Sequence, residues 1–310
     1  MTGSRLGPGP EFDRIRSIAA ALGPLAPNIG DDCAVIPDGT GTLVASTDTS
    51  VEGVHFRLDW ISLEEAGYRA AASAISDLAA AGARVVGILA AVSAPAGASP
   101  EELASWMRGV GAVLESTGGV VLGGDLTAGE RWSATITVLG RADRVMRRSG
   151  AHAGDGVWVT GKLGGARAAL HAWTAGRTPD PAARESFARP VPRIAAGMWL
   201  MQRGATAMMD LSDGLAGDAG HLAAASEVGI EIDLERVPVH PSVGALDRGL
   251  FAARGGEDYE LLACLPSSFA ESDAAGVSLT RIGSVVAGQG VRLLRGGKTI
   301  PLPSSYNHFA

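Results

Sequence analysis

Seven aspartates lie in short breaks rich in glycine, serine or threonine, and each break adjoins an apolar run. These breaks are Gly30-Asp31-Asp32, Ser46-Thr47-Asp48, Ser76-Asp77, Gly123-Gly124-Asp125 and Asp210-Leu211-Ser212-Asp213-Gly214. A fold that brings such carboxylates together must offset their repulsion, roughly 4 kcal/mol for two unit charges about 4 Å apart at an effective dielectric constant near 20. Hard cations such as Mg²⁺, which prefer oxygen ligands, supply that compensation. The pattern therefore favours a fold that gathers acid groups around bound cations.

The composition of the chain excludes several classes of partner. With 310 residues, the chain is long enough for two domains with full hydrophobic cores. Its net charge of −7, with Lys162 and Lys298 as the only lysines, argues against a general nucleic-acid or anionic-membrane surface. No apolar stretch reaches the length of a membrane span, and Cys33 and Cys264 lack metal-ligand spacing. We therefore expect a reduced, cytoplasmic protein with no nucleic-acid or membrane partner.

Hydrophobic periodicity predicts alternating strands and helices in the first half of the chain. Ser62 with Glu65, and Ser99 with Glu102, form two capping boxes, each of which predicts the start of a helix. Asp77 falls in the last turns of the first of these helices, among small neighbours three and four positions away, so that a ligand can approach closely. The predicted helices cover residues 11–22, 62–81 and 99–116, and the predicted strands cover residues 33–36, 42–46, 85–92, 120–122 and 132–139.

A polar, glycine-rich segment at residues 148–156 divides the chain. Beyond it, strands are predicted at residues 157–160, 207–209, 230–234 and 259–265, helices at 192–203 and 215–227, and a small β region at the end. The fold class is therefore α/β (mixed α+β), with two domains of similar size at residues 1–148 and 149–310.

Each candidate functional residue also has a structural interpretation when it is taken alone. Gly-Asp and Ser-Asp pairs are common in turns and helix caps, and residues 210–214 are compatible with an N-cap for the helix that follows. Arg148 is a candidate phosphate clamp, because its guanidinium can bind two oxygens; a surface arginine is the alternative. His55 is a candidate substrate contact or a structural histidine. The acidic run at residues 257–260 would be costly to bury, so it is predicted to line a cleft.

Seven segments, in order along nearly the whole chain, carry a specific resemblance. They are Gly-Asp-Asp-Cys-Ala (30–34), Ser-Thr-Asp-Thr-Ser-Val-Glu-Gly-Val-His-Phe (46–56), Ser-Asp-Leu-Ala-Ala-Ala-Gly-Ala (76–83), Gly-Gly-Asp (123–125), Arg-Ser-Gly-Ala (148–151), Asp-Leu-Ser-Asp-Gly-Leu (210–215) and Gly-Gly-Glu-Asp-Tyr-Glu-Leu (255–261). Together they resemble the thiamine-monophosphate kinase family, within the wider aminoimidazole ribonucleotide synthetase-like superfamily. The chain differs from the family's usual pattern at Leu126, where a threonine is common.

This resemblance implies direct in-line transfer of the γ-phosphoryl group of ATP onto thiamine monophosphate, with several Mg²⁺ ions as cofactors. It also implies a two-domain fold whose N-terminal domain binds ATP and metal and forms a homodimer. The implied metal ligands are Asp32, Ser46, Thr47, Asp48, Asp77, Asp125, Asp210 and Asp213. The implied nucleotide contacts are Asp125, Arg148 and Ser212, and the implied thiamine contacts are His55, Glu257 and Tyr306. The implied catalytic residues are Asp77, Asp125, Arg148 and Asp213.

Two other functions stay open at this point. An aminoimidazole ribonucleotide synthetase-like enzyme would share several of the aspartate breaks and also consume ATP. A catalytically silent, metal-binding dimer would share the carboxylates without turnover. A selenophosphate synthetase is disfavoured, because it should carry a reactive cysteine near its N-terminus, whereas Cys33 lies in an apolar context.

Overall fold

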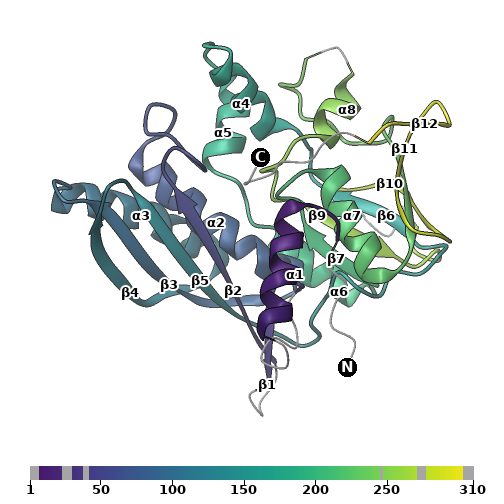
Figure 1. Cartoon of the computed structure of the whole chain (residues 1–310), viewed down its shortest axis with the longest axis horizontal. Helices are drawn as coiled ribbons and strands as arrows, with labels where there is room; N and C mark the ends of the chain where they lie inside the picture. Colours follow the sequence, from purple (N-terminus) through teal and green to yellow (C-terminus); the bar gives the residue numbers. More distant parts are fainter. Residues whose placement is uncertain (1–6, 23–29, 38–41, 245–246, 271–276, 303–310) are drawn as a thin grey trace.

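The computed structural model describes residues 7–22, 30–37, 42–244, 247–270 and 277–302, and contains two mixed β-sheets that lie side by side (Figure 1). The first sheet ends at Ala142 and the second begins at Gly156, so the boundary predicted after residue 148 falls in the connection between them. A two-domain, mixed α/β architecture is therefore confirmed. Tyr306 lies outside the described residues.

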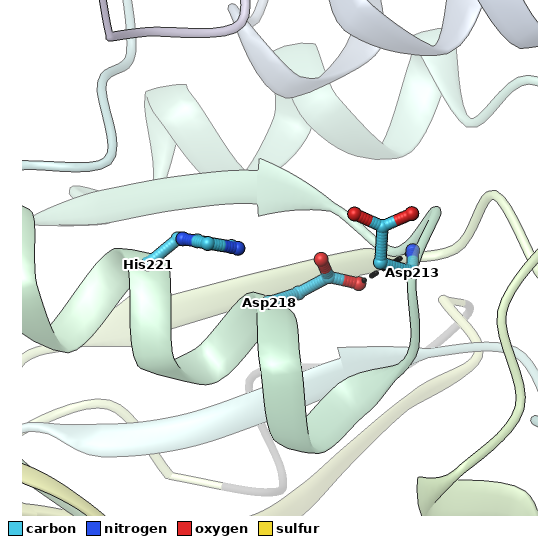
Figure 2. Close-up of side chains that lie close together, drawn as sticks. All are labelled: Asp213, Asp218 and His221. Atoms are coloured by element: carbon cyan, nitrogen blue, oxygen red, sulfur yellow. Dashed lines mark hydrogen bonds between the residues drawn. The ribbon is translucent and has the colours of Figure 1, made fainter. Parts of the chain in front are cut away.

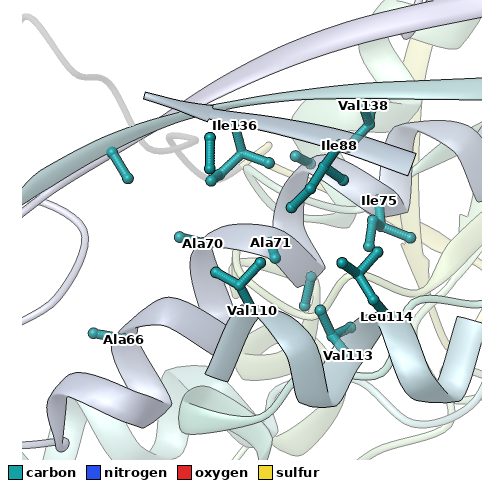
Figure 3. Close-up of a cluster of buried hydrophobic side chains, with 14 of the residues drawn as sticks. Ala66, Ala70, Ala71, Ile75, Ile88, Val110, Val113, Leu114, Ile136 and Val138 are labelled. Atoms are coloured by element: carbon teal, nitrogen blue, oxygen red, sulfur yellow. The ribbon is translucent and has the colours of Figure 1, made fainter. Parts of the chain in front are cut away.

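The first sheet has helices on one face and an open second face. Its strands are β1 (Ala34–Pro37), β2 (Thr42–Val51), β3 (Arg84–Pro95), β4 (Val120–Gly129) and β5 (Ser133–Ala142), in the spatial order β1-β2-β5-β3-β4. Helices α2 (Leu63–Ala80) and α3 (Pro100–Thr117) pack on one face, where Ile75, Ile88 and Val110 are fully buried (Figure 3). On the opposite face the exposed hydroxyls of Thr47 and Thr137 contact each other at 3.1 Å.

Helices α2 and α3 pack backbone to backbone, because glycines lie at their contact. A Cβ added at Gly67 would lie 2.0 Å from the carbonyl oxygen of Trp106, and one added at Gly109 would lie 1.8 Å from that of Glu64. Both helices begin with the capping boxes expected from the sequence. This close packing fixes α2 beneath the sheet and thereby fixes the position of Asp77 in its last turn.

The second sheet holds the C-terminal half of the chain. Its strands are β6 (Gly156–Thr160), β7 (Ala207–Asp210), β8 (Gly229–Asp233), β9 (Leu261–Leu265), β10 (Leu279–Val286), β11 (Gly290–Arg295) and β12 (Lys298–Ile300), in the spatial order β12-β11-β8-β10-β6-β9-β7. The helices of this half are α4 (Gly165–Thr174), α5 (Pro181–Ala188), α6 (Ile194–Gln202), α7 (Leu215–Ser226) and α8 (Arg248–Ala253). The first helix, α1 (Pro10–Leu22), reaches α7 through Phe12, whose ring stacks on His221.

The structure corrects two predicted strand ends. Strand β2 continues to Val51 and β4 continues to Gly129, so Asp48 and Asp125 lie inside strands rather than in breaks at strand ends. Each of these strands pairs along its full length with a long neighbour, which carries the polar segment into the sheet. Helices α5 and α8 were not predicted. Within the described ranges, no helix is both long and apolar enough to cross a membrane.

Candidate active site between the two sheets

Three carboxylates from three separate elements form a cluster where the two domains meet. Asp32 lies just before β1, Asp77 lies in the last turn of α2, and Asp210 is the last residue of β7 in the second sheet. One carboxylate oxygen from each lies within 4.8 Å of those of the other two. The fold therefore brings together acid groups that are far apart in the sequence.

Burial strongly disfavours the charged forms of this cluster. It raises the pKa of Asp77 well above its ordinary value, and the neighbouring Asp210 and Asp32 raise it further. The pKa of Asp210 is raised to about 7, first by burial and then by Asp32. The hydroxyl of Ser46 donates to Asp77 Oδ2 at 2.6 Å and partly offsets the shift. Without a counter-cation, the charged forms of Asp77 and Asp210 are strongly disfavoured.

Arg148 supplies the nearest positive charge. Its Nε and Nη2 donate to the same oxygen, Asp32 Oδ1, at 3.2 and 2.6 Å. Its backbone N–H donates to Asp31 Oδ1 at 3.0 Å, and Arg147 Nη1 donates to the other oxygen of Asp31 at 2.9 Å. The segment after β5 is therefore attached to the Asp31-Asp32 pair, and the Arg148 guanidinium lies at the cluster.

A second cluster lies where β7 turns into α7, and contains Asp213, Asp218 and His221 (Figure 2). The backbone N–H groups of Asp213 and Gly214 donate to Asp218 Oδ2 at 3.2 and 3.0 Å. Gly214 is the N-cap residue of α7 and has no side chain to cap the helix. Asp218, in the first turn, instead accepts from the backbone N–H of the N-cap residue, as the acid of a capping box does, and fixes the loop that carries Ser212 and Asp213. Asp218 was not predicted as a site residue, although an acid in the first turn after a glycine cap is a usable signal.

The remaining predicted metal ligands take different positions. Asp48 contributes to the raised pKa of both Asp77 and Asp210, which puts it on the cluster side of β2. Thr47 places its side chain on the opposite face. Asp125 shares a cross-strand row with Ala91, Thr135 and Thr49, so three strand spacings, about 14 Å, separate its backbone from β2. Asp125 is therefore not brought to the acidic cluster within this chain.

A cavity of about 490 Å³ lies next to these clusters and is lined by both domains. His55 and Trp60 come from the loop after β2, Phe187 comes from α5, and Ser212 and Glu257 come from loops of the second sheet. Its remaining lining residues are Val54, Arg167, Leu170, Arg254 and Gly256. The prediction that the acidic run lines a cleft is confirmed for Glu257. Trp60 and Phe187 were missed, since nothing in their sequence neighbourhood distinguishes them from core aromatics.

Two loops of this site are hydrogen-bonded to each other along their backbones. The N–H groups of Glu257 and Tyr259 donate to the carbonyls of Ser212 and Leu211 at 2.7 and 2.9 Å. In return, Leu211 N–H donates to the carbonyl of Glu260 at 2.8 Å. The loop that lines the cavity and the loop that carries the acids therefore form one unit.

Comparison with known proteins agrees with this geometry. Residues 30–142 match the N-terminal domain, and residues 152–295 the C-terminal domain, of AIR synthase related proteins. A thiamine-monophosphate kinase of Halobacterium salinarum is 37% identical over 286 residues, covering 90% of this chain and 95% of the relative. The chain belongs to the thiamine-monophosphate kinase family. The Escherichia coli K12 kinase is 36% identical, with 96% of each chain covered.

A solved structure points to the same family. The complex of AaThiL with AMPPCP and TMP superposes with a TM-score of 0.87 at 31% identity, over 100% of this chain and 99% of that chain. The family expected from the motifs is thereby confirmed, and with it the prediction of an enzyme of the thiamine-phosphate kinase class.

The raised pKa of Asp210 predicts an unusual dependence of stability on pH. Because the folded-state pKa is about 7 against an ordinary 3.8, the stabilising contribution of this group is present below the unfolded-state pKa and is lost as pH rises through about 7. Without divalent ions, Asp210→Asn should therefore melt several degrees above the wild type at pH 8, and the gap should narrow towards pH 5. Thermal unfolding in chelator measures this, with the exposed Glu130→Gln as control. An equal gap at both pH values would contradict the assignment.

The two hydrogen bonds to Asp218 predict a loop that opens when they are removed. Asp218→Ala leaves two N–H groups without an acceptor and should destabilise the fold by about 1–3 kcal/mol. Amide hydrogen exchange of residues 211–216 should accelerate at least tenfold, measured by mass spectrometry. Asp218→Asn keeps an acceptor oxygen and should exchange nearly as slowly as the wild type. Slow exchange in the alanine variant would show that other contacts hold the loop.

Proposed function

We propose that this protein phosphorylates thiamine monophosphate to thiamine diphosphate at the site between its two sheets, using ATP as donor. The observation that carries the proposal is the position of Ser212, where the cavity meets the two acidic clusters. This residue lines the cavity and lies two positions from Asp210 and one from Asp213, so the cavity opens beside both acidic clusters. An acceptor held in the cavity with its phosphate at this end would lie next to the cation-binding groups.

The cavity lining suits a thiamine ring system. The aromatic faces of Trp60 and Phe187 favour a cationic heterocycle, and the Glu257 carboxylate can accept hydrogen bonds from an amino group. Trp60 is held in place because its ring is stacked on Trp173 at 5.0 Å. Glu257, together with His55, supports the assignment of this cavity to thiamine monophosphate.

The acidic clusters suit Mg²⁺. Mg²⁺ prefers carboxylate oxygens as ligands, and one oxygen from each of Asp32, Asp77 and Asp210 lies within 4.8 Å of the other two, which suits one shared cation. When bound, Mg²⁺ ions would neutralise the phosphates of both substrates. We assign Asp32, Asp48, Asp77, Asp210 and Asp213 as the carboxylate ligands, with Ser46 holding the Asp77 oxygen in place.

The chain's own groups then act mainly by orientation and charge. Attack of one phosphate on another requires neutralisation and alignment rather than a strong base. Arg148 is placed to contact phosphate oxygens of the nucleotide, because its guanidinium already lies beside Asp32. Ser212, which lines the cavity and lies two positions from Asp210, would then lie between donor and acceptor. No covalent phosphoenzyme is needed, so the γ-phosphoryl group passes from ATP directly to the acceptor phosphate in one in-line step.

A homodimer would explain the open face of the first sheet. Strand β4 is an edge strand exposed along nearly its whole length, and Val121, Leu122 and Leu126 are 45 to 59% exposed. Such an edge is a template for pairing with a second chain. A second copy paired along this edge would cover Leu126. Where it also lies over the open face it would cover Leu89 and give Asp125 and Thr47 a route to a site shared between protomers.

The test of the function is turnover. The purified protein should convert thiamine monophosphate and MgATP to thiamine diphosphate and ADP, followed by chromatography of both products. ATP consumption with formylglycinamidine ribonucleotide instead would support the aminoimidazole ribonucleotide synthetase-like alternative. No turnover with either substrate would favour a catalytically silent metal-binding dimer.

The position of Asp77 predicts a separation of activity from stability. Asp77→Asn removes a carboxylate from the centre of the cluster and should lower kcat by at least about a hundredfold, because charge neutralisation of both phosphates is lost. The ligand-free variant should melt at or above the wild-type temperature, since one repelling charge is gone. Steady-state kinetics and thermal unfolding measure the two effects. Normal turnover of the variant would show that Asp77 is not part of the active site.

The exposed edge strand predicts the oligomeric state. Leu126→Arg places a charge on the proposed contact and should convert dimer to monomer in sedimentation velocity, with loss of most activity. Val191→Arg, an exposed apolar position outside the first sheet, is the control and should stay dimeric. A wild-type monomer that is fully active would overturn the dimer proposal.

A further inference from the structure

Arg69, in the first half of α2, is a buried charged residue to which the site described above gives no role. Its side chain is only 3% exposed. One guanidinium nitrogen, Nη1, donates to the carbonyl oxygen of Phe187 at 2.6 Å, and Nη2 forms an ion pair with Glu257. The guanidinium also lies 4.0 Å from the ring centre of Phe187 and 5.8 Å from that of Tyr259. A buried arginine with these partners holds groups in the opposite domain.

The loop that Arg69 contacts has an unfavourable backbone conformation. Glu257 and Tyr259 have φ values of +72° and +49°, in the left-handed region that non-glycine residues rarely adopt. Such a strained conformation persists only where surrounding contacts impose it. The backbone hydrogen bonds to Leu211 and Ser212 supply part of this constraint. The ion pair with Arg69 constrains the same loop from the other domain.

Arg69 lies behind the wall of the cavity rather than in it. Glu257 and Phe187 line the cavity, and Arg69 contacts both without being part of the lining. We propose that Arg69 is a positioning residue for substrate recognition, which fixes the Glu257 carboxylate and the Phe187 ring as one wall of the thiamine-binding cavity. The inference rests on the proposed function, since it concerns how that substrate is held.

The geometry requires an arginine. A guanidinium can donate to the Glu257 carboxylate and the Phe187 carbonyl from different nitrogens while its flat face lies over the Phe187 ring. A lysine ammonium carries the same charge but has no flat face, and it cannot reproduce all three contacts. Arg69→Lys should therefore be intermediate between the wild type and Arg69→Met.

A purely structural ion pair between the domains is the alternative, and the chain offers a matched control. Arg189, at the end of α5, pairs with Glu64 of α2 at 3.5 Å and lies 5.5 Å from the ring centre of Tyr68. It joins the same two helices by an ion pair and an aromatic contact, at a more exposed position. Neither Arg189 nor its partners line the cavity. Arg189→Met therefore removes an interdomain pair without touching the substrate wall.

Steady-state kinetics separates the two interpretations. Arg69→Met should raise KM for thiamine monophosphate about tenfold or more, which corresponds to the loss of about one charge-assisted hydrogen bond. KM for ATP should change less than twofold. Arg69→Lys should give a smaller rise, and Arg189→Met should leave both KM values within twofold of the wild type. Equal KM values for thiamine monophosphate in Arg69→Met and Arg189→Met would overturn the proposal.

A double-mutant cycle keeps the test valid if Arg69→Met fails to fold. If Arg69 acts through Glu257, Arg69→Lys should weaken binding of thiamine monophosphate, measured by calorimetry without ATP, in the wild type but by less than twofold in Glu257→Gln. Additive effects would show that Arg69 does not act through Glu257 and would contradict the inference. An inactive wild-type enzyme would instead contradict the proposed function itself, so the two failures are distinguishable.

Discussion

Mutual repulsion among buried carboxylates is the constraint on which the site depends. Asp32, Asp77 and Asp210 come from both domains and meet at oxygen separations within 4.8 Å. Burial removes the water that would screen them, and the pKa values of Asp77 and Asp210 rise as a result. Arg148 and Ser46 offset only part of this repulsion. The folded chain thus holds carboxylates at the seam whose charged forms are disfavoured until a cation binds beside them.

The surrounding fold keeps these groups in place despite that repulsion. The close contact of α2 with α3 and the Asp218 hydrogen bonds fix the two elements that deliver Asp77 and Asp213. Backbone hydrogen bonds join the loops at Leu211 and Glu257. The two loops approach closely, because a Cβ added at Gly256 would lie 2.5 Å from the carbonyl oxygen of Ser212. The positions of Asp77 and Asp213 are therefore set by the packing of the elements that carry them and do not depend on attraction between the clustered side chains.

Patterns that span a few residues predicted more of the fold and of the site than could be inferred about contacts between distant parts of the chain. Both capping boxes, the position of Asp77 in its helix and the loop at Asp210 follow from spacing within a few residues, and the structure agrees. The predictions that strands end before Asp48 and Asp125 were wrong. Pairing of β2 with β5 and of β4 with β3 extends the sheet through these polar segments. The separation of Asp125 from the cluster depends on strand order, which no local pattern encodes. Arg69 had a signal, as a lone cation in an alanine-rich helix, but its partners are more than 100 residues away.

Helix α2 carries both the attractive and the repulsive interactions between the domains. Glu65, near its start, forms an ion pair with Arg184, and Arg69 one turn later holds the loop at Glu257. Asp77, eight residues further and about 12 Å along the axis, repels Asp210. Partly exposed pairs such as Glu65 with Arg184 contribute little individually. The buried contacts of Arg69 therefore oppose the repulsion at the far end of the helix, together with the apolar packing of Ala79 and Ala80 against Leu200 and Met201.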